Sequence, residues 1–240
     1  MTPDILPAQF ETGVADFVSG WFMQRQTVSE PHALCQCLFI IIQLVAQKLS
    51  DGIYMSPELQ SAAGMQFIHD IQDAERIVDC ILNLICPELH SIGTQAINKL
   101  KEGAWLENRH ESIKQWTSMY SGIEVIVNRV TPVHRDPAAA PTMYDFLISA
   151  GTHEEVWLDL PDVKARLSYN PGTAVALSGR VLRHGVAKWI SGERICIAHF
   201  IRENVHERLG LHRPDWVTQR DYLHLMPEDF VNRHGWGRQL

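Results

Sequence analysis

The sequence lacks the features that mark membrane, secreted and disordered proteins. Its longest apolar stretch, residues 33–49, is interrupted by Gln36, Gln43 and Gln47 and is shorter than the roughly 20 apolar residues that a membrane span requires. No basic segment followed by an apolar run occurs at the N-terminus, so we expect no secretory signal in the chain as given. With 45% hydrophobic and 20% charged residues among 240, the composition is that of a globular protein with a sizeable core.

Cysteines are few and positive charge is unevenly distributed. The five cysteines, at positions 35, 37, 80, 86 and 196, show no repeated CxxC pairing, which fits reduced thiols in a cytosolic or nuclear protein. Through residue 128 the chain has 7 Lys and Arg against 15 Asp and Glu, whereas the remainder has 14 against 13. The net charge of −7 gives no overall electrostatic argument for nucleic-acid binding. Twelve of the 14 later cations are arginine, which suits anionic ligands.

The first half of the chain has the periodicity of helices. Apolar residues recur at helical spacing over residues 69–86, acidic residues lie near the start of this segment, and Pro87 follows it. This pattern predicts an amphipathic helix. Residues 31–49 and 92–106 are also expected to be helical.

After Trp116 the pattern changes to short β-strands. Segments rich in β-branched residues are separated by Pro, Gly and Asp turns, at residues 122–130, 142–149, 155–160, 166–169, 173–177, 185–190 and 194–201. Strands of this length and spacing predict a sandwich or jelly roll rather than βαβ units. We expect one domain over residues 1–240: a mainly helical layer (1–116), a β core (117–204) and an irregular C-terminal segment with short helices (205–240).

His134 and Asp136 form an HxD motif, and His184 follows 48 residues after the aspartate. In a strand, residues i and i+2 share a face, so His134 and Asp136 can point at one metal while His184 arrives from another strand. Two imidazoles and one carboxylate leave coordination positions open and suit Fe(II) chemistry with a chelating co-substrate and O₂. Zinc accepts the same donors, but hydrolytic zinc sites more often use a helical HExxH motif, which this chain lacks.

Arg194 lies ten residues after His184 and begins an alternating strand. Alternation places every second residue from Arg194 to Phe200 on one face, predicted to point inward. An inward arginine requires an anion, and a dicarboxylate that chelates iron at one end offers its far carboxylate for a charge-assisted pair. A plainer explanation stays open, in which His134 caps a turn, Arg194 pairs with a surface acid and Phe200 is ordinary core.

Four later histidines, at positions 206, 212, 224 and 234, match no zinc-binding spacing. We expect these side chains to be solvated.

The segments VTPVHRDP and NPGTAVALSGRVLRHGVAKWISGERICIAHFIREN resemble the Fe(II)/2-oxoglutarate dioxygenases. Within them the chain looks most like the ten-eleven translocation and J-binding-protein group, especially its compact fungal, transposon-associated members. The resemblance covers about residues 122–204. Its HxD…His-x9-Arg core is shared by the whole superfamily, whereas HGV, a short turn and then GERI point to this branch. The resemblance implies an α+β fold, in which a double-stranded β-helix (jelly-roll) core has flanking N-terminal helices.

The resemblance also implies which residues hold the cofactors. His134, Asp136 and His184 would hold Fe(II), and Arg194 would bind the distal carboxylate of 2-oxoglutarate. Arg129 lies where relatives carry an arginine near the cofactor. Simple alternation puts Arg129 on the face opposite His134, unless a bulge at the intervening proline, residue 132, changes the phase.

Relatives oxidise the methyl group of a modified base in DNA, and such an enzyme must flip the base out and hold it against an apolar surface. Phe200 is the best stacking candidate. Arg202, with Arg135, Arg180 and Arg183, is expected to rim the barrel mouth and contact DNA phosphates. Cytosine-oxidising relatives can place a carboxylate shortly after the metal-binding aspartate, whereas residues 137–140 here are PAAA.

The sequence therefore predicts a dioxygenase that couples 2-oxoglutarate decarboxylation to oxidation of a methylated base, either 5-methylcytosine or N6-methyladenine, and so to DNA demethylation. We expect DNA and O₂ as partners, no membrane association, no obligate protein partner and a nuclear location. Two alternatives stay open. One is an oxygenase acting on a small molecule or a protein side chain, and the other is a catalytically dead DNA-binding relative, against which the intact triad argues.

Overall fold

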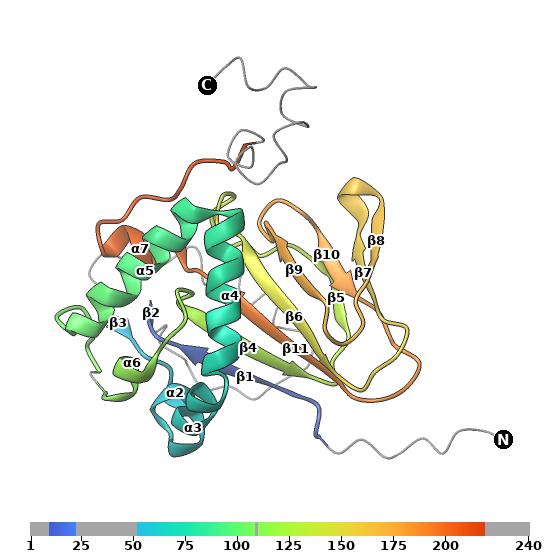
Figure 1. Ribbon diagram of the computed structural model, residues 1–240, viewed down its shortest axis with the longest axis horizontal. Helices are drawn as coiled ribbons and strands as arrows, with labels where there is room; N and C mark the ends of the chain where they lie inside the picture. The colour runs from blue at the N-terminus through green and yellow to red at the C-terminus, as the bar shows by residue number, and fades with distance from the viewer. Residues whose placement is uncertain (1–9, 23–51, 109, 219–240) are drawn as a thin grey trace, which may run out of the picture.

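Two antiparallel sheets form the β core of the computed structural model, which describes residues 10–22, 52–108 and 110–218 (Figure 1). The larger sheet has the order β1-β4-β11-β6-β9 and the smaller has the order β5-β10-β7-β8. Their strands are β1 (Gly13–Val18), β4 (Gly122–Val127), β5 (Thr131–His134), β6 (Asp145–Gly151), β7 (Trp157–Leu160), β8 (Ala165–Ser168), β9 (Ala174–Leu177), β10 (His184–Val186) and β11 (Arg194–Phe200). A separate short pair joins β2 (Trp21–Phe22) to β3 (Ile53–Tyr54).

The strands from β4 to β11 divide between the two sheets in the order of a jelly roll. Side chains of both sheets meet in one apolar cluster, which includes Leu158 on β7, Val186 on β10, Leu177 on β9 and Cys196 on β11. The predicted double-stranded β-helix with flanking helices is therefore confirmed.

Helices cover the other face of the larger sheet. They are α2 (Pro57–Gln60), α3 (Ala62–Asp70), α4 (Gln72–Ile85), α5 (Pro87–Glu102), α6 (Ser112–Gln115) and α7 (Glu203–Arg208), and a 3-10 helix, η1 (Pro161–Val163), links β7 to β8. One cluster packs Leu59 and Leu100 with Ile123 of β4, and another packs Leu82 of α4 with Phe146 of β6. None of the helices in the described part of the chain is long and apolar enough to cross a membrane.

The buried pair His199–Glu75 fixes the strand that carries Arg194 to the helical layer. His199 on β11 lies 2.8 Å from Glu75 of α4 and 2.9 Å from the carbonyl oxygen of Phe146. Both side chains are almost completely buried. β11 is held by its neighbours β4 and β6 and also by α4. The backbone of Arg194, the first residue of β11, is therefore firmly fixed.

The first 116 residues are less uniformly helical than predicted. Residues 13–18 form β1, an edge strand of the larger sheet paired with β4. The predicted helix over residues 69–86 is divided at Ile71, whose backbone dihedral angles (φ −88°, ψ 0°) interrupt the hydrogen-bond pattern between α3 and α4. The next helix begins at Pro87 rather than at residue 92, as expected for a proline at the first helical position. The helix expected at 31–49 lies outside the described residues.

Strand boundaries in the β core also differ from the prediction, most of them by one to three residues, and β5 was not among the predicted strands. The strand expected over 122–130 ends at Val127 because Asn128 has a positive φ of 51°, a left-handed conformation that ends the extended strand. The strand expected at 185–190 is shorter and begins at His184. It ends before the turn in which the indole of Trp189 donates to the carbonyl oxygen of Gly192.

Candidate metal and co-substrate site

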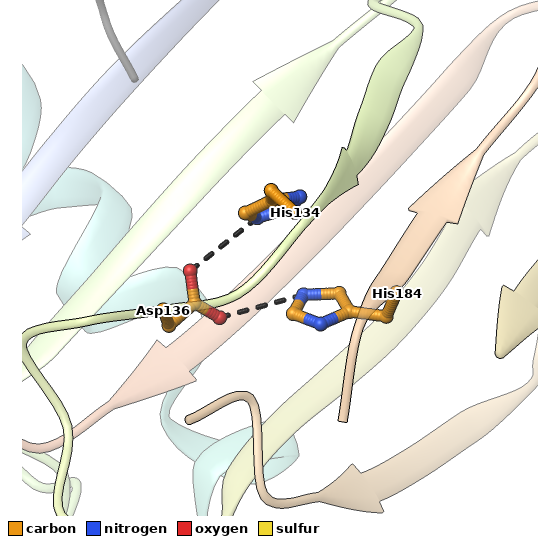
Figure 2. Close-up of side chains that lie close together, drawn as sticks. All are labelled: His134, Asp136 and His184. Carbon is orange, nitrogen blue, oxygen red and sulfur yellow. Dashed lines mark ion pairs between the residues drawn. The ribbon is translucent and has the colours of Figure 1, made fainter. Parts of the chain in front are cut away.

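The three side chains predicted as iron ligands converge in the structure (Figure 2). His134 ends β5, Asp136 follows two residues later, and His184 begins β10, where it is the register partner of His134. One potential ligand atom from each residue lies within 4.8 Å of the others. Oδ1 of Asp136 is 3.3 Å from Nε2 of His134, and its Oδ2 is 3.4 Å from Nε2 of His184.

Hydrogen bonds to the backbone orient both imidazoles. Nδ1 of His134 lies 2.8 Å from the carbonyl oxygen of Pro132, and Nδ1 of His184 lies 3.1 Å from that of Leu182. A carbonyl accepts only, so each Nδ1 donates, and in the neutral ring each Nε2 keeps its lone pair. Two lone pairs and a carboxylate then face the same point. This donor set fits a divalent iron, and the carbonyl bonds that fix the tautomers are those expected around metal-bound histidines.

The charges of the triad shift its pKa values in different directions. The hydrogen bond that a protonated His134 ring donates to Asp136 raises the pKa of His134, whereas burial lowers the pKa of His184. Burial acts to raise the pKa of Asp136, but the hydrogen bond to His134 and the charges of the two histidines and Arg202 together hold it below its usual value. Asp136 is therefore ready to bind a cation as a carboxylate.

A bulge and a glycine make this convergence possible. Thr131 of β5 pairs with Val186 of β10, and His134 pairs with His184. The two pairs are three residues apart along β5 but only two residues apart along β10. Pro132, which has no N–H to donate, lies in this bulge. The amide of Asp136 donates to the carbonyl oxygen of Gly179, and a Cβ at residue 179 would lie 2.3 Å from Oδ2 of Asp136. A glycine is therefore required beside the carboxylate.

Arg194 is a buried cation with an unused donor. Its side chain is 1% exposed and its Nη1 donates to the carbonyl oxygen of Arg129 (2.9 Å), but its Nε has no hydrogen-bond partner. No acid among the described residues forms an ion pair with Arg194, so the alternative of a surface ion pair is wrong. A buried guanidinium with an unpaired N–H is costly unless an anion completes it. The far carboxylate of 2-oxoglutarate fits this requirement.

Asn128 and Tyr169 hold Arg194 in place, and the sequence analysis identified neither. The backbone N–H of Arg194 donates to Oδ1 of Asn128, and the N–H of Asn128 donates to the carbonyl oxygen of Arg194. The guanidinium carbon lies 5.9 Å from the ring centroid of Tyr169, and the hydroxyl of Tyr169 is 3.4 Å from Sγ of Cys196. An asparagine that ends a strand is a weak sequence signal, and Tyr169 becomes a neighbour only through the fold.

Arg129 contacts Arg194 through its backbone carbonyl, not through its side chain. It follows the left-handed Asn128 and precedes the bulge at Pro132, so simple alternation does not connect it to His134. The predicted cofactor-binding role of the Arg129 side chain stays a prediction.

Phe200 lies on the same strand as Arg194 and is half-buried. Its ring lies over Gly122, where a Cβ would come within 2.2 Å of the ring. The guanidinium carbon of Arg202 is 4.7 Å from the centroid of this ring, close enough for a cation–π interaction. Gly122 and Arg202 therefore lie against the Phe200 ring, and the predicted role of Phe200 in stacking a base stays a prediction.

Arg202 is surrounded by carboxyl groups rather than standing free on the surface. Burial lowers its pKa, and the charges of Asp16, Glu124, Asp145 and Asp136 act in the opposite direction. These carboxyl groups would compete with a DNA phosphate for the guanidinium of Arg202. Its predicted role in substrate binding stays a prediction.

Acidic groups that were not predicted from the sequence lie near the triad. Glu124 is the register partner of both Asp16 and Ala198, so it lies on the face of the larger sheet that carries Arg194. Burial, with the charge of Asp16, raises the pKa of Glu124 to about 7. Burial and the charge of Asp136 raise the pKa of Asp145 well above its usual value. Protonated carboxyl groups donate as well as accept hydrogen bonds, which suits the polar edge of a substrate.

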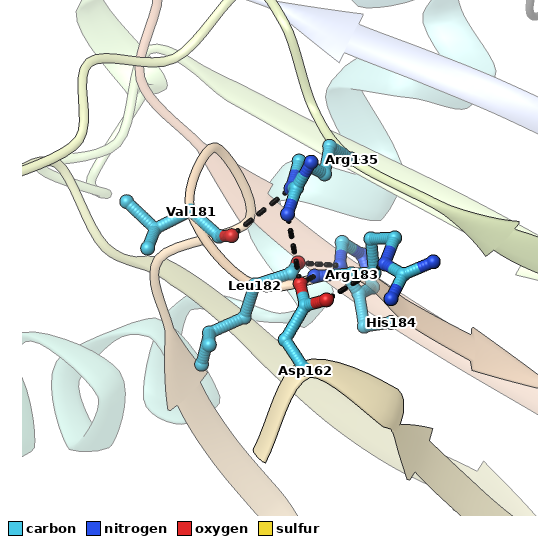
Figure 3. Close-up of polar contacts among 6 residues, drawn as sticks. All are labelled: Arg135, Asp162, Val181, Leu182, Arg183 and His184. Atoms are coloured by element: carbon cyan, nitrogen blue, oxygen red, sulfur yellow. Dashed lines mark hydrogen bonds and ion pairs between the residues drawn. The ribbon is translucent and has the colours of Figure 1, made fainter. Parts of the chain in front are cut away.

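Three arginines predicted to contact DNA are exposed, but each already has a partner. Figure 3 shows two of them, Arg135 and Arg183. Arg135 and Arg183 both bind Asp162, and Arg180 donates to the carbonyl oxygen of Pro137. To contact a DNA phosphate, these arginines would have to share their N–H donors with their present partners. Their predicted contact with DNA stays a prediction.

His206 is buried, so the expectation of a solvated side chain is wrong for this residue. It is 1% exposed on α7, and neither ring nitrogen has a hydrogen-bond partner. The next histidine along the chain, His212, is exposed as expected, whereas residues 224 and 234 lie outside the described residues. Burial lowers the pKa of His206 to about 4.

His206 is expected to make the protein sensitive to mild acid. A histidine whose pKa is lower in the folded state contributes stability above its unfolded pKa of about 6.5, which is lost as the pH falls toward 4. Between pH 7 and pH 5 this loss amounts to about 2 kcal/mol of unfolding free energy. Denaturant unfolding of His206→Leu should show that much less acid destabilisation than the wild type, with His212→Leu as the exposed control. Equal pH dependence of wild type and His206→Leu would contradict the assignment.

Comparisons with known proteins found a family model and solved structures that are similar to this chain. A family model, Tet_JBP, described as the oxygenase domain of the 2OGFeDO superfamily, matches residues 56–203, more than half of the chain. Among solved structures, NgTET1 in complex with 5mC DNA is 19% identical, with a TM-score of 0.49 over 78% of this chain and 72% of that chain. A Cupin 2 conserved barrel domain protein from Salinispora arenicola CNS-205 is 18% identical, with a TM-score of 0.27 over 37% of this chain and 69% of that chain.

No curated protein matches the chain. The family match and the His-Asp-His site agree on Fe(II) and 2-oxoglutarate as cofactors. The chain belongs to the Tet_JBP family and is an oxygenase domain of the 2-oxoglutarate and Fe(II)-dependent superfamily.

Proposed function

We propose that this oxygenase oxidises the methyl group of a methylated base in DNA, with 5-methylcytosine and N6-methyladenine as the candidate substrates. The observation that carries the proposal is the convergence of His134, Asp136 and His184 in a jelly roll that also buries Arg194 with a free donor. Oxidation of a methyl group on nitrogen would release formaldehyde and thereby remove the methyl group. A nuclear location would bring the enzyme to such a substrate.

Each group of residues has its own task in this proposal. His134, Asp136 and His184 would hold Fe(II), which together with 2-oxoglutarate supplies the oxidising chemistry when bound. Arg194 would bind the far carboxylate of 2-oxoglutarate by a charge-assisted hydrogen bond and so orient it. The carbonyl oxygens of Pro132 and Leu182 keep a proton on Nδ1 of each histidine, so both Nε2 atoms remain free to bind the metal.

The substrate assignment is supported by Phe200 and by the carboxyl groups near it. Phe200 offers an aromatic surface on the strand of Arg194, and a flipped base is commonly held by stacking and by hydrogen bonds to its polar edge. Residues 137–140 provide no carboxylate after Asp136. Glu124 lies on the face that carries Phe200, so a carboxyl group reaches this region from the larger sheet instead. This arrangement leaves both bases as candidates.

Nucleoside mass spectrometry tests the proposal. The protein, supplied with Fe(II), 2-oxoglutarate and O₂, is incubated with duplexes that carry 5-methylcytosine, N6-methyladenine or no methyl group. Conversion of either methylated base is the expected result. Iron-dependent succinate formation without conversion of either base would contradict a DNA substrate and favour a small molecule or a protein side chain. Absence of succinate under all conditions would favour the catalytically inactive relative.

Replacing Phe200 with alanine separates base stacking from a purely structural role. Stacking of a base on an aromatic ring is worth roughly 1–3 kcal/mol, so oxidation of the methylated base should fall at least about tenfold, the equivalent of 1.4 kcal/mol. Turnover of 2-oxoglutarate without DNA should survive. Phe146→Ala, which removes an aromatic residue from the helix-facing cluster, is the control. If Phe200→Ala loses both activities in proportion to its loss of folded protein, Phe200 is core.

A further inference from the structure

One carboxylate joins the two chain segments that carry the candidate iron ligands. Asp162 lies in η1, between β7 and β8. Its Oδ2 accepts hydrogen bonds from Nη2 of Arg135 (3.0 Å) and from the backbone N–H of Arg183 (2.8 Å), and its Oδ1 accepts from Nε of Arg183 (2.7 Å) (Figure 3). The hydrogen bonds from Arg183, the one from its backbone amide most strongly, and the charges of both arginines lower the pKa of Asp162.

The two arginines are sequence neighbours of the three ligands. Arg135 lies between His134 and Asp136, and Arg183 immediately precedes His184. Adjacent residues of an extended chain point to opposite sides. The ligands thus turn toward one another (Figure 2), while both guanidinium groups reach Asp162.

A further hydrogen bond joins the HxD segment directly to the segment before His184. Nε of Arg135 donates to the carbonyl oxygen of Val181 at 3.0 Å, so Arg135 also contacts the segment that leads to His184. The β5–β10 pairing beside the ligands is short and irregular, with its bulge between the two register pairs that flank it. The backbone ladder alone therefore fixes the spacing between His134 and His184 less firmly than a regular pair of strands would.

We propose that Asp162 is a positioning residue for the metal centre, which fixes the distance between the HxD segment and His184 from the outer side. Asp162 does not touch the metal or the substrate. It binds the segments behind the ligands, so the ligand atoms are already close together before an ion arrives. The inference rests on the proposed metal site and adds a residue to it.

A metal titration of the purified protein tests this role without any turnover. Co(II), added under anaerobic conditions and followed by its visible absorption, reports both affinity and ligand geometry. Loss of a group that orients metal ligands typically costs 10–100-fold in metal affinity. We expect Asp162→Ala to bind Co(II) at least about tenfold more weakly, and Asp162→Glu to recover part of this affinity. His134→Ala is measured in parallel and should lose the site.

Asp159→Ala is the matched control. Asp159 lies on the same hairpin, and its carboxylate forms a similar pair with Arg166, at 2.6 Å. Its backbone pairs with Gly185 of β10, a contact that the alanine variant keeps, whereas its carboxylate is bound to Arg166 rather than to a ligand segment. A general loosening of the hairpin would lower Co(II) affinity in both variants, whereas the proposed role lowers it only for Asp162→Ala. Should Asp162→Ala fail to fold, Asp162→Asn, which removes the charge and keeps the shape, takes its place.

The outcomes separate this inference from the metal site itself. If His134→Ala loses Co(II) but Asp162→Ala and Asp162→Asn bind it as the wild type does, the positioning role is wrong and the metal site stands. Equal losses in the Asp162 and Asp159 variants would also overturn the inference. If the wild type and His134→Ala bind Co(II) equally, the proposed metal site fails, and the positioning role falls with it.

Discussion

Asp136→Ala is expected to reduce succinate formation from 2-oxoglutarate at least about 1,000-fold, a loss equivalent to about 4 kcal/mol. Asp136 is the only carboxylate of the triad, and it faces Nε2 of both histidines. Without it the site retains two neutral imidazoles, so the charge that balances a divalent ion is removed. His134→Ala should have a similar effect because it removes one of the two nitrogen ligands.

The loss should come from the metal site rather than from the fold. Thermal unfolding and circular dichroism of Asp136→Ala are expected to remain close to those of the wild type. Asp73→Ala, which removes an exposed aspartate paired with Arg76 on α4, should leave succinate formation unchanged. Full activity of Asp136→Ala, with normal metal content, would contradict the assignment of the triad as the metal site.

Arg194→Ala is expected to raise the apparent Michaelis constant for 2-oxoglutarate on the order of 100-fold or more. The side chain is buried and has a free Nε for an anion. Loss of one partner from a buried ion pair costs about 3–5 kcal/mol. Because Arg194 is not a metal ligand, the affinity for Co(II) measured without 2-oxoglutarate should change little.

Comparing the Michaelis constant for 2-oxoglutarate with the affinity for Co(II) distinguishes a co-substrate role of Arg194 from a structural one. Arg194→Lys keeps a charge but loses the planar donor pair, so its Michaelis constant should lie between those of the wild type and Arg194→Ala. An unchanged Michaelis constant together with weakened Co(II) binding would contradict the assignment of Arg194 to 2-oxoglutarate.

The β core and the ligand triad could be predicted because their signals are local. Alternation along residues 194–201 gave the strand β11 and the inward direction of Arg194, which the structure buries. The HxD spacing placed two ligands on one side of the chain, and His184 on β10 is the register partner of His134. These patterns depend on neighbours one or two residues apart, and such relations survive folding unchanged.

The contacts that prepare the site could not be predicted because they join residues distant in the sequence. Asp162 lies 27 residues from Arg135 and 21 from Arg183, and nothing in its own neighbourhood indicates either partner. Glu124 belongs to an alternating strand whose pattern was read for apolar residues, and Asp16 became its partner only when residues 13–18 formed an edge strand. His206 carried no sequence signal for burial, because a polar side chain in a polar segment is ordinarily exposed.

The residues of the candidate site thus come from both sheets. The smaller sheet supplies the candidate iron ligands, and the larger sheet supplies Arg194, Phe200 and the carboxyl group of Glu124. Because β11 is also tied to α4 through the His199–Glu75 pair, the helical layer acts on the position of Arg194, the proposed ligand of 2-oxoglutarate. We expect substitutions in this pair to alter stability and 2-oxoglutarate binding together.

The measurement that tests the central claim most directly is the ratio of succinate formed to methylated base oxidised in one reaction. The account predicts that a methylated duplex raises succinate formation above the unmethylated control, and that each additional succinate accompanies one oxidation event on the methyl group. Succinate formation that is equal with methylated and unmethylated duplexes, with both methylated bases recovered intact by mass spectrometry, would contradict the claim.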